Sequence, residues 1–123
     1  MAWSFNEHTP VYIQIADKLR NDIISGIFPA GEQIPTVRQL AMTAAVNPNT
    51  VQRALTELES EGIIHAKGTN GRFVTEDEQI LLSAREASAR RLVKDFIAQA
   101  QCMSISKSEL IKMIEEDNEY EHS

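Results

Sequence analysis

The chain has 123 residues, of which 42% are hydrophobic and 24% charged, which suits one small domain and argues against a globally disordered chain. The formal net charge of −6 argues against a basic protein that coats nucleic acid and against a protein that binds anionic membranes. The single cysteine excludes an intrachain disulfide and a cysteine-rich zinc site. The longest aliphatic run, residues 80–82, is too short to span a membrane and the first residues do not form a signal peptide, so we expect a cytoplasmic protein without a membrane partner.

The first predicted helix covers about residues 10–25. Thr9 offers a capping hydroxyl, Pro10 suits the first helical position, and apolar residues then recur at helical spacing. Gly26 supplies a left-handed cap that ends the helix. Tyr12 lies among the apolar positions, and we interpret it as a packing residue.

Two short helices are predicted next, after a very short strand at residues 32–34. Thr36 with Gln39 three residues later forms a capping box that opens the first helix. Asn47 followed by Pro48 opens the second, as an N-cap with proline at the first helical position. Its apolar residues recur at helical spacing: Val51, Ala54, Leu55 and Leu58. Two helices joined this closely predict a helix-turn-helix motif.

After Gly62 the apolar period changes from 3.6 to two. Residues 63–67 and 72–75 are strand candidates, and Asn70-Gly71 between them is the dipeptide favoured by a type I′ hairpin turn. A helix-turn-helix followed by a hairpin is a winged helix. The predicted fold class is therefore α+β, mainly α, with an N-terminal winged helix-turn-helix domain over residues 1–75.

Residues 76–123 are predicted to form a helical dimerisation segment with an acidic tail. One long helix covers residues 76–103, and Ser106 with Glu109 forms a capping box that opens a second helix. Two such helices cannot bury a core alone, so their apolar stripe predicts a homodimer. The alternative is that the stripe packs on its own winged helix. The predicted interface residues are Leu82, Ala89, Val93, Phe96, Ala100, Met103, Leu110, Ile111 and Ile114.

Several motifs follow one another along residues 9–75. They are Pro10-Val11-Tyr12-Ile13-Gln14-Ile15, Ile34-Pro35-Thr36-Val37-Arg38-Gln39-Leu40-Ala41, Asn47-Pro48-Asn49-Thr50-Val51-Gln52-Arg53-Ala54-Leu55 and Gly71-Arg72-Phe73-Val74. In order and spacing they resemble the GntR family of bacterial transcription regulators, and the short helical tail resembles its YtrA-type branch. The resemblance implies a DNA-binding repressor, and regulators of that branch often control operons for membrane transporters or envelope stress. Pro48 stands where many relatives have an arginine that contacts DNA.

The predicted winged helix suggests which residues bind double-stranded DNA. A recognition helix places its N-terminal residues against base edges, helix starts bind phosphates, and a wing contacts the minor groove or the backbone. The candidate residues are Thr36, Arg38, Asn47, Asn49, Thr50, Gln52, Arg53, Lys67, Asn70 and Arg72. Arg38 and Arg53 are the only charged side chains between Gln33 and Thr56, so a local positive surface can exist on this acidic chain.

Several of these residues also have plainer interpretations. Arg53 could pair with Glu57 four residues later, and Asn47 is useful as a helix cap in any case. Lys67 and Arg72 could be ordinary hairpin charges. We interpret Cys102 as a packing residue.

The sequence gives little support for an enzyme. The three histidines are scattered, and the glycine-rich stretch 68–71 lacks the Lys-Ser/Thr of a phosphate-binding loop, so we expect no catalytic residue, metal site or cofactor. We predict a sequence-specific dimeric repressor that acts at an inverted-repeat operator. The alternative is a winged helix that serves as a protein-interaction module without DNA. Neither the target genes nor a small-molecule effector is indicated.

Overall fold

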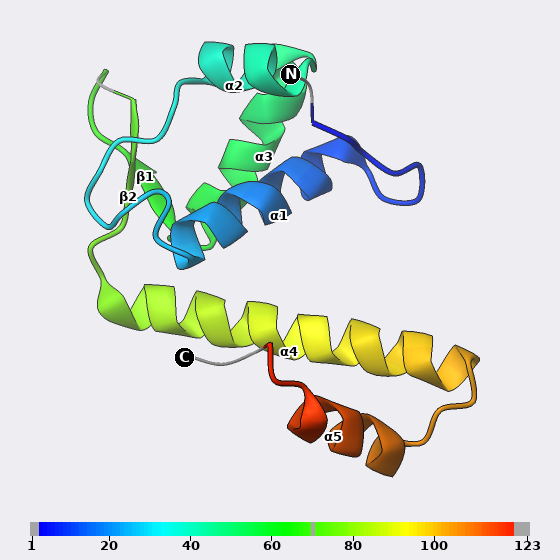
Figure 1. Ribbon diagram of the computed structural model, residues 1–123. Coiled ribbons are helices and arrows are strands. Elements are labelled where there is room, and N and C mark those ends of the chain that lie inside the picture. Colours follow the sequence, from blue (N-terminus) through cyan, green and yellow to red (C-terminus); the bar gives the residue numbers. More distant parts are fainter. Residues whose placement is uncertain (1–2, 70, 120–123) are drawn as a thin grey trace. The chain divides into compact units, whose positions relative to one another are not determined.

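The computed structural model, described for residues 3–69 and 71–119, contains five helices and a two-stranded sheet in that part of the chain (Figure 1). The elements are α1 (Val11–Ile24), α2 (Val37–Ala44), α3 (Pro48–Ser60), β1 (Ile64–Ala66), β2 (Arg72–Val74), α4 (Glu78–Cys102) and α5 (Lys107–Glu116). The predicted fold class, a mainly helical winged helix-turn-helix followed by two helices, is confirmed. The chain divides into two compact units, one ending at Glu86 and one starting at Ala87, so α4 contributes to both.

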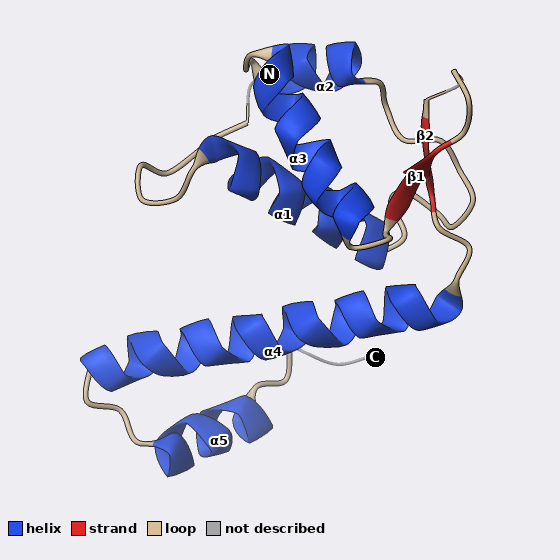
Figure 2. Ribbon diagram, turned by 180° about the vertical axis from the view of Figure 1, so that it is seen from behind, coloured by secondary structure: helices blue, strands red, loops and turns tan. Residues whose placement is uncertain are grey.

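In the first unit, α1 and α2 both pack against α3 (Figure 2). The helices form because their apolar residues recur at helical spacing, and burying those residues stabilises the packed helices. The largest fully buried side chains are Ile15, Leu19, Val51, Leu55, Leu58, Ile63, Ile64 and Val74. Leu40 and Ala41 of α2 belong to the same cluster, so the core combines all three helices and both strands.

The short connection between α2 and α3 is fixed by local hydrogen bonds. Thr36 Oγ1 accepts from the Gln39 N–H at 3.1 Å, and Gln39 Oε1 accepts from the Thr36 N–H at 2.8 Å, as the predicted capping box requires. Ala45 adopts a left-handed conformation (φ 59°) that ends α2. Asn47 Oδ1 then accepts from the Asn49 N–H at 2.7 Å, which confirms the predicted cap of α3.

The start of α1 differs from the prediction by one residue. Pro10 is the N-cap, with an extended conformation (φ −53°, ψ 140°), and no side chain of the described residues caps the helix start. The prediction that Thr9 is the cap is therefore wrong. The Gln14 side-chain amide instead donates to the Thr9 carbonyl at 2.7 Å, while Gly26 (φ 87°) follows the helix end as predicted.

The wing is a short antiparallel hairpin. Ile64 pairs with Val74, and the predicted strand at residues 32–34 is present as an isolated bridge between Gln33 and Phe73. Asn70 lies outside the described residues, so the predicted type I′ turn at Asn70-Gly71 is not described.

The first turns of α4 pack against the core of the winged helix through Ile80, Leu81 and Ala84. The alternative considered for this helix, packing on its own winged helix, therefore applies to its first turns, although Ile80, Leu81 and Ala84 are not among the predicted stripe residues. We retain the predicted limits, 1–75 and 76–123, as a proposal for the division of function.

In the second unit, α5 turns back alongside the C-terminal half of α4 (Figures 1 and 2). The predicted capping box is confirmed: the Ser106 N–H donates to Glu109 Oε1 at 3.1 Å, and this hydrogen bond lowers the pKa of Glu109. Ala100 and Leu110 are the residues that this unit buries in the described part of the chain. Cys102, interpreted as a packing residue, is exposed in the single chain.

A buried arginine ties α1 to the end of α3. Arg20 Nε donates to Glu61 Oε1 at 2.9 Å, and Arg20 Nη1 donates to Asp17 Oδ1 at 2.7 Å. The hydrogen bond to Glu61 raises the pKa of Arg20, whose side chain is only 8% exposed. A carboxylate at a helix C-terminus is unfavourable for the helix dipole, and Arg20 offsets that cost at Glu61.

We expect Glu61→Gln to lower the free energy of unfolding by about 2 kcal/mol, because it leaves a buried guanidinium without its main charged partner. Asp17→Asn is the matched control and should cost less than about 1 kcal/mol, because exposed ion pairs contribute little. Urea denaturation followed by circular dichroism measures both. Equal losses for the two variants would contradict the importance assigned to the Arg20–Glu61 pair.

Candidate nucleic-acid interface

The polar side of α3 faces solvent because its apolar side is fully used by the core. Val51, Ala54, Leu55 and Leu58 are all 0% exposed. The side chains of Asn49, Gln52 and Arg53 are exposed, and that of Thr50 is half-buried. These predicted base-reading residues therefore lie together on the first two turns of the helix.

The start of α2 adds two of the predicted phosphate-binding residues. Thr36 and Arg38 are both exposed. The Thr36 oxygen accepts the hydrogen bond of the capping box, and its hydroxyl hydrogen remains a donor. A helix start offers backbone N–H groups and a positive dipole end, so this corner of the molecule suits an anion.

Arg53 is held against the first turn of α1. Its guanidinium carbon lies 3.9 Å from the centroid of the Tyr12 ring. Beside this pair is an open hollow of about 390 Å³, lined by Pro10, Val11, Tyr12, Asn49, Thr50 and Arg53. Sequence analysis missed the contact, because an arginine and a tyrosine 41 positions apart leave no local signal. Tyr12 is also half-buried against the core, as its interpretation as a packing residue expected.

The wing presents its predicted residues unequally. Lys67 is exposed, and its Nζ lies 5.3 Å from the centroid of the Phe73 ring. Arg72 is half-buried, and its Nε lies 3.3 Å from Glu59 Oε1, so this arginine links the hairpin to α3. Asn70 lies outside the described residues. Lys67 is thus the better placed of the two described wing cations for a contact with DNA.

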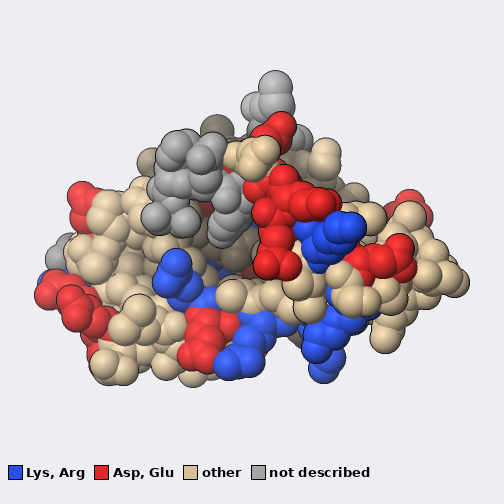
Figure 3. All heavy atoms as spheres, turned by 60° about the horizontal axis from the view of Figure 1, so that its bottom comes forward, with Lys and Arg blue, Asp and Glu red and all other residues tan. Residues whose placement is uncertain are grey.

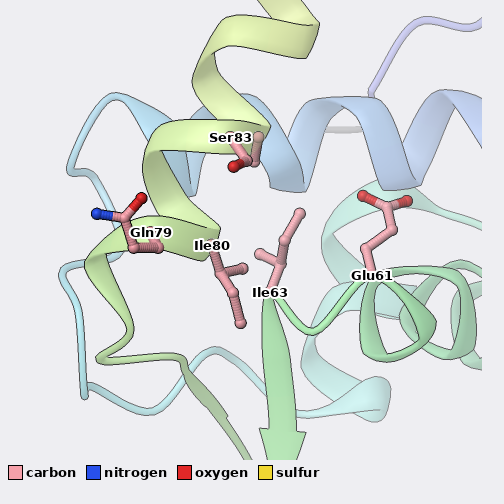
Figure 4. Close-up of a pocket in the computed structure, with 6 residues that line it drawn as sticks. Glu61, Ile63, Gln79, Ile80 and Ser83 are labelled. Carbon is pink, nitrogen blue, oxygen red and sulfur yellow. The ribbon is translucent and has the colours of Figure 1, made fainter.

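A second open hollow, of about 330 Å³, lies between the end of α3, the wing and the start of α4 (Figure 4). Ile63 and Ile80 face each other across it, while Gln79 and Ser83 project from α4. The Glu61 carboxylate at its edge is already bound to Arg20. Among residues 3–69 and 71–119, no three His, Cys, Asp or Glu side chains lie close enough together to hold a metal ion.

The predicted dimer-interface residues divide into two groups. Ala100 and Leu110 are 4% and 8% exposed, so they are already buried within the second unit. Ala89 is exposed, and the large side chains are 44–71% exposed: Leu82, Val93, Phe96, Met103, Ile111 and Ile114.

Figure 3 shows Lys and Arg side chains interspersed with Asp and Glu on the face it presents, which has no broad region of one charge sign. No helix in the described part of the chain is long and apolar enough to cross a membrane.

The chain is similar to known bacterial regulators along most of its length. Residues 11–74 match the sequence model of the family described as "Bacterial regulatory proteins, gntR family". The chain is 32% identical over 109 residues to "HTH-type transcriptional repressor YtrA" of Bacillus subtilis (strain 168), covering 88% of this chain and 84% of YtrA. This similarity extends beyond the winged helix into the C-terminal helices.

Solved structures agree with this comparison. The "GntR family transcriptional regulator from Listeria monocytogenes" superposes with a TM-score of 0.82 at 32% identity, covering 93% of this chain and 100% of that one. The DNA-binding domain of AraR, solved in complex with operator ORE1, gives a TM-score of 0.54 at 25% identity, covering 61% of this chain and 93% of that one.

Proposed function

The chain belongs to the GntR family of bacterial regulatory proteins, and from this premise we propose that it is a sequence-specific repressor that binds double-stranded DNA as a dimer. The observation that carries the proposal is the polar face of α3, where Asn49, Gln52 and Arg53 are exposed opposite a fully buried apolar face. The relatives are named as transcription regulators, and we propose no catalytic activity for this chain.

Base reading is assigned to the first turns of α3, in the major groove. Arg53 would donate two hydrogen bonds to guanine, whereas Asn49 and Gln52 suit adenine. Thr50, half-buried beside them, and Asn47, whose side chain already caps the helix, would contact the backbone next to those bases.

Phosphate contacts would set the position of the domain on DNA. Thr36 and Arg38 at the start of α2 and Lys67 on the wing are exposed and suit this role. A contact from Arg72 to a phosphate would have to replace its pairing with Glu59. The acidic residues of the chain lie mostly after residue 75, so a positive surface around α2 and α3 is compatible with the net charge of −6.

The exposed apolar stripe of the second unit supports a homodimer. In a monomer, Phe96, Val93 and Met103 would remain largely in water, and burying a large apolar side chain contributes about 1.5–3 kcal/mol. A two-fold dimer would present two recognition helices, which fits an inverted-repeat operator whose half-sites lie one or more helical turns apart.

Selection from a randomised duplex library tests the function. We expect the protein to enrich an inverted repeat. We also expect the logarithm of its affinity to fall linearly with the logarithm of salt concentration, with a slope of about −0.9 for each phosphate contact. Failure to enrich any duplex, with the protein folded and dimeric, would favour the interaction module and contradict DNA binding.

Two substitutions test the assignment of roles on the enriched duplex. Arg53→Ala should lose about 1–3 kcal/mol of discrimination against a scrambled duplex, because it removes a base contact. Lys67→Ala should weaken binding to both duplexes equally and reduce the salt slope by about one, because it removes a phosphate contact. Competition binding at three salt concentrations separates these effects, and identical behaviour of the two variants would refute the assignment.

Phe96→Glu should convert the dimer into monomers, because it places a charge in the apolar stripe at a residue that is 44% exposed in the single chain. Sedimentation equilibrium gives the mass. Ile27→Glu is the matched control, since Ile27 is 65% exposed but lies in the winged helix, and it should leave the mass unchanged. A dimeric Phe96→Glu variant would exclude the stripe as the interface.

A further inference from the structure

We propose that Tyr12 is a positioning residue for DNA recognition, which holds the guanidinium of Arg53 in the orientation that reads a base. The proposal rests on the function proposed above and deepens it, because it assigns part of the sequence specificity to α1, outside the helix-turn-helix.

The geometry places the two side chains in direct contact. The guanidinium carbon of Arg53 lies 3.9 Å from the Tyr12 ring centroid, well inside the range of a cation–π interaction. Tyr12 is half-buried against the apolar core, so packing fixes the plane of its ring. The ring thus provides a rigid surface on which a long and otherwise mobile side chain can rest.

Stacking leaves the donors of Arg53 available. The N–H groups of a guanidinium point outward in its own plane, so an aromatic ring against one face takes none of them. Arg20 and Arg72 differ in this respect, because they are paired with carboxylates: Arg20 with Glu61 and Asp17, and Arg72 with Glu59. Arg53 is therefore held in place while its edge remains able to form the bidentate contact that guanine offers.

A held side chain binds more tightly because it has less freedom to lose. Arginine has many rotamers, and ordering them on binding weakens the interaction. The ring of Tyr12 restricts Arg53 before DNA arrives. The restriction should benefit the base contact far more than contacts with the backbone, so its loss should lower specificity rather than general affinity for DNA.

The test uses the 123-residue chain, the duplex that it enriches from the randomised library, and a scrambled duplex of the same composition. The variants are Tyr12→Phe, which keeps the ring, and Tyr12→Leu, which removes it. Ile13→Ala is the matched control, since Ile13 is a half-buried neighbour on α1 that does not line the hollow beside Arg53. Circular dichroism verifies that each variant is folded.

We expect Tyr12→Phe and Ile13→Ala to keep the ratio of the two affinities. Tyr12→Leu should reduce the ratio about fivefold, the effect of losing a cation–π interaction at an exposed site, with the scrambled duplex bound as before. In an Arg53→Ala background, Tyr12→Leu should have no further effect on the ratio, since the two residues act as one unit.

Two outcomes would overturn the proposal. If Tyr12→Leu keeps the ratio, the ring does not position Arg53. If Tyr12→Phe loses as much as Tyr12→Leu, the hydroxyl acts instead, as a direct contact to DNA. A protein that enriches no duplex at all would contradict the proposed function and not this inference alone.

A measurement on the unmodified protein covers the case in which Tyr12→Leu does not fold. Protons above an aromatic ring resonate upfield, so the side-chain Nε–H and Cδ–H signals of Arg53 should be shifted upfield in the free protein, and equally in Tyr12→Phe. Signals of Arg53 at the positions of an unstructured arginine would overturn the proposal.

Discussion

The structure depends on α3, because one face of this helix forms the core and the other face is exposed to solvent. Four of its thirteen residues are completely buried on one side, and they join α1, α2 and the hairpin in a single core. A helix that gives one full face to the core must present its other face to solvent. Asn49, Gln52 and Arg53 are exposed for that reason, and the same burial that stabilises the fold holds them at fixed positions on a rigid element.

The short connection before α3 fixes where that exposed face begins. Ala45 has left-handed backbone torsion angles, which cost an alanine about 1 kcal/mol or more relative to the right-handed conformation. Asn47 then caps α3 through the Asn49 N–H, and Pro48 fits the first helical position without needing a donor. The connection from α2 to α3 thus takes only residues 45–47. A connection this short restricts how the starts of α2 and α3 are placed relative to each other.

Features set by local sequence were predictable, and features set by distant contacts were not. Capping boxes at Thr36 and Ser106 and the change of apolar period after Gly62 define elements within a few residues, so the helices and the hairpin were predicted correctly. The Arg20–Glu61 pair and the stacking of Arg53 on Tyr12 each join residues 41 positions apart, and only the tertiary fold brings them together. The sequence predicted the helix face that forms the candidate site, but it did not predict the side-chain orientation of Arg53.

If the chain forms the homodimer proposed above, association and folding of the second unit would be linked. In the described part of the chain it buries Ala100 and Leu110, two side chains of modest size, while Phe96 is 44% and Met103 71% exposed. Such limited burial falls far short of the conformational entropy lost when α5 is ordered against α4. A second copy would supply the missing apolar surface, and mass action would then make the order of these helices depend on protein concentration. Because α4 also packs on the winged helix through Ile80 and Leu81, its N-terminal turns are supported within the single chain.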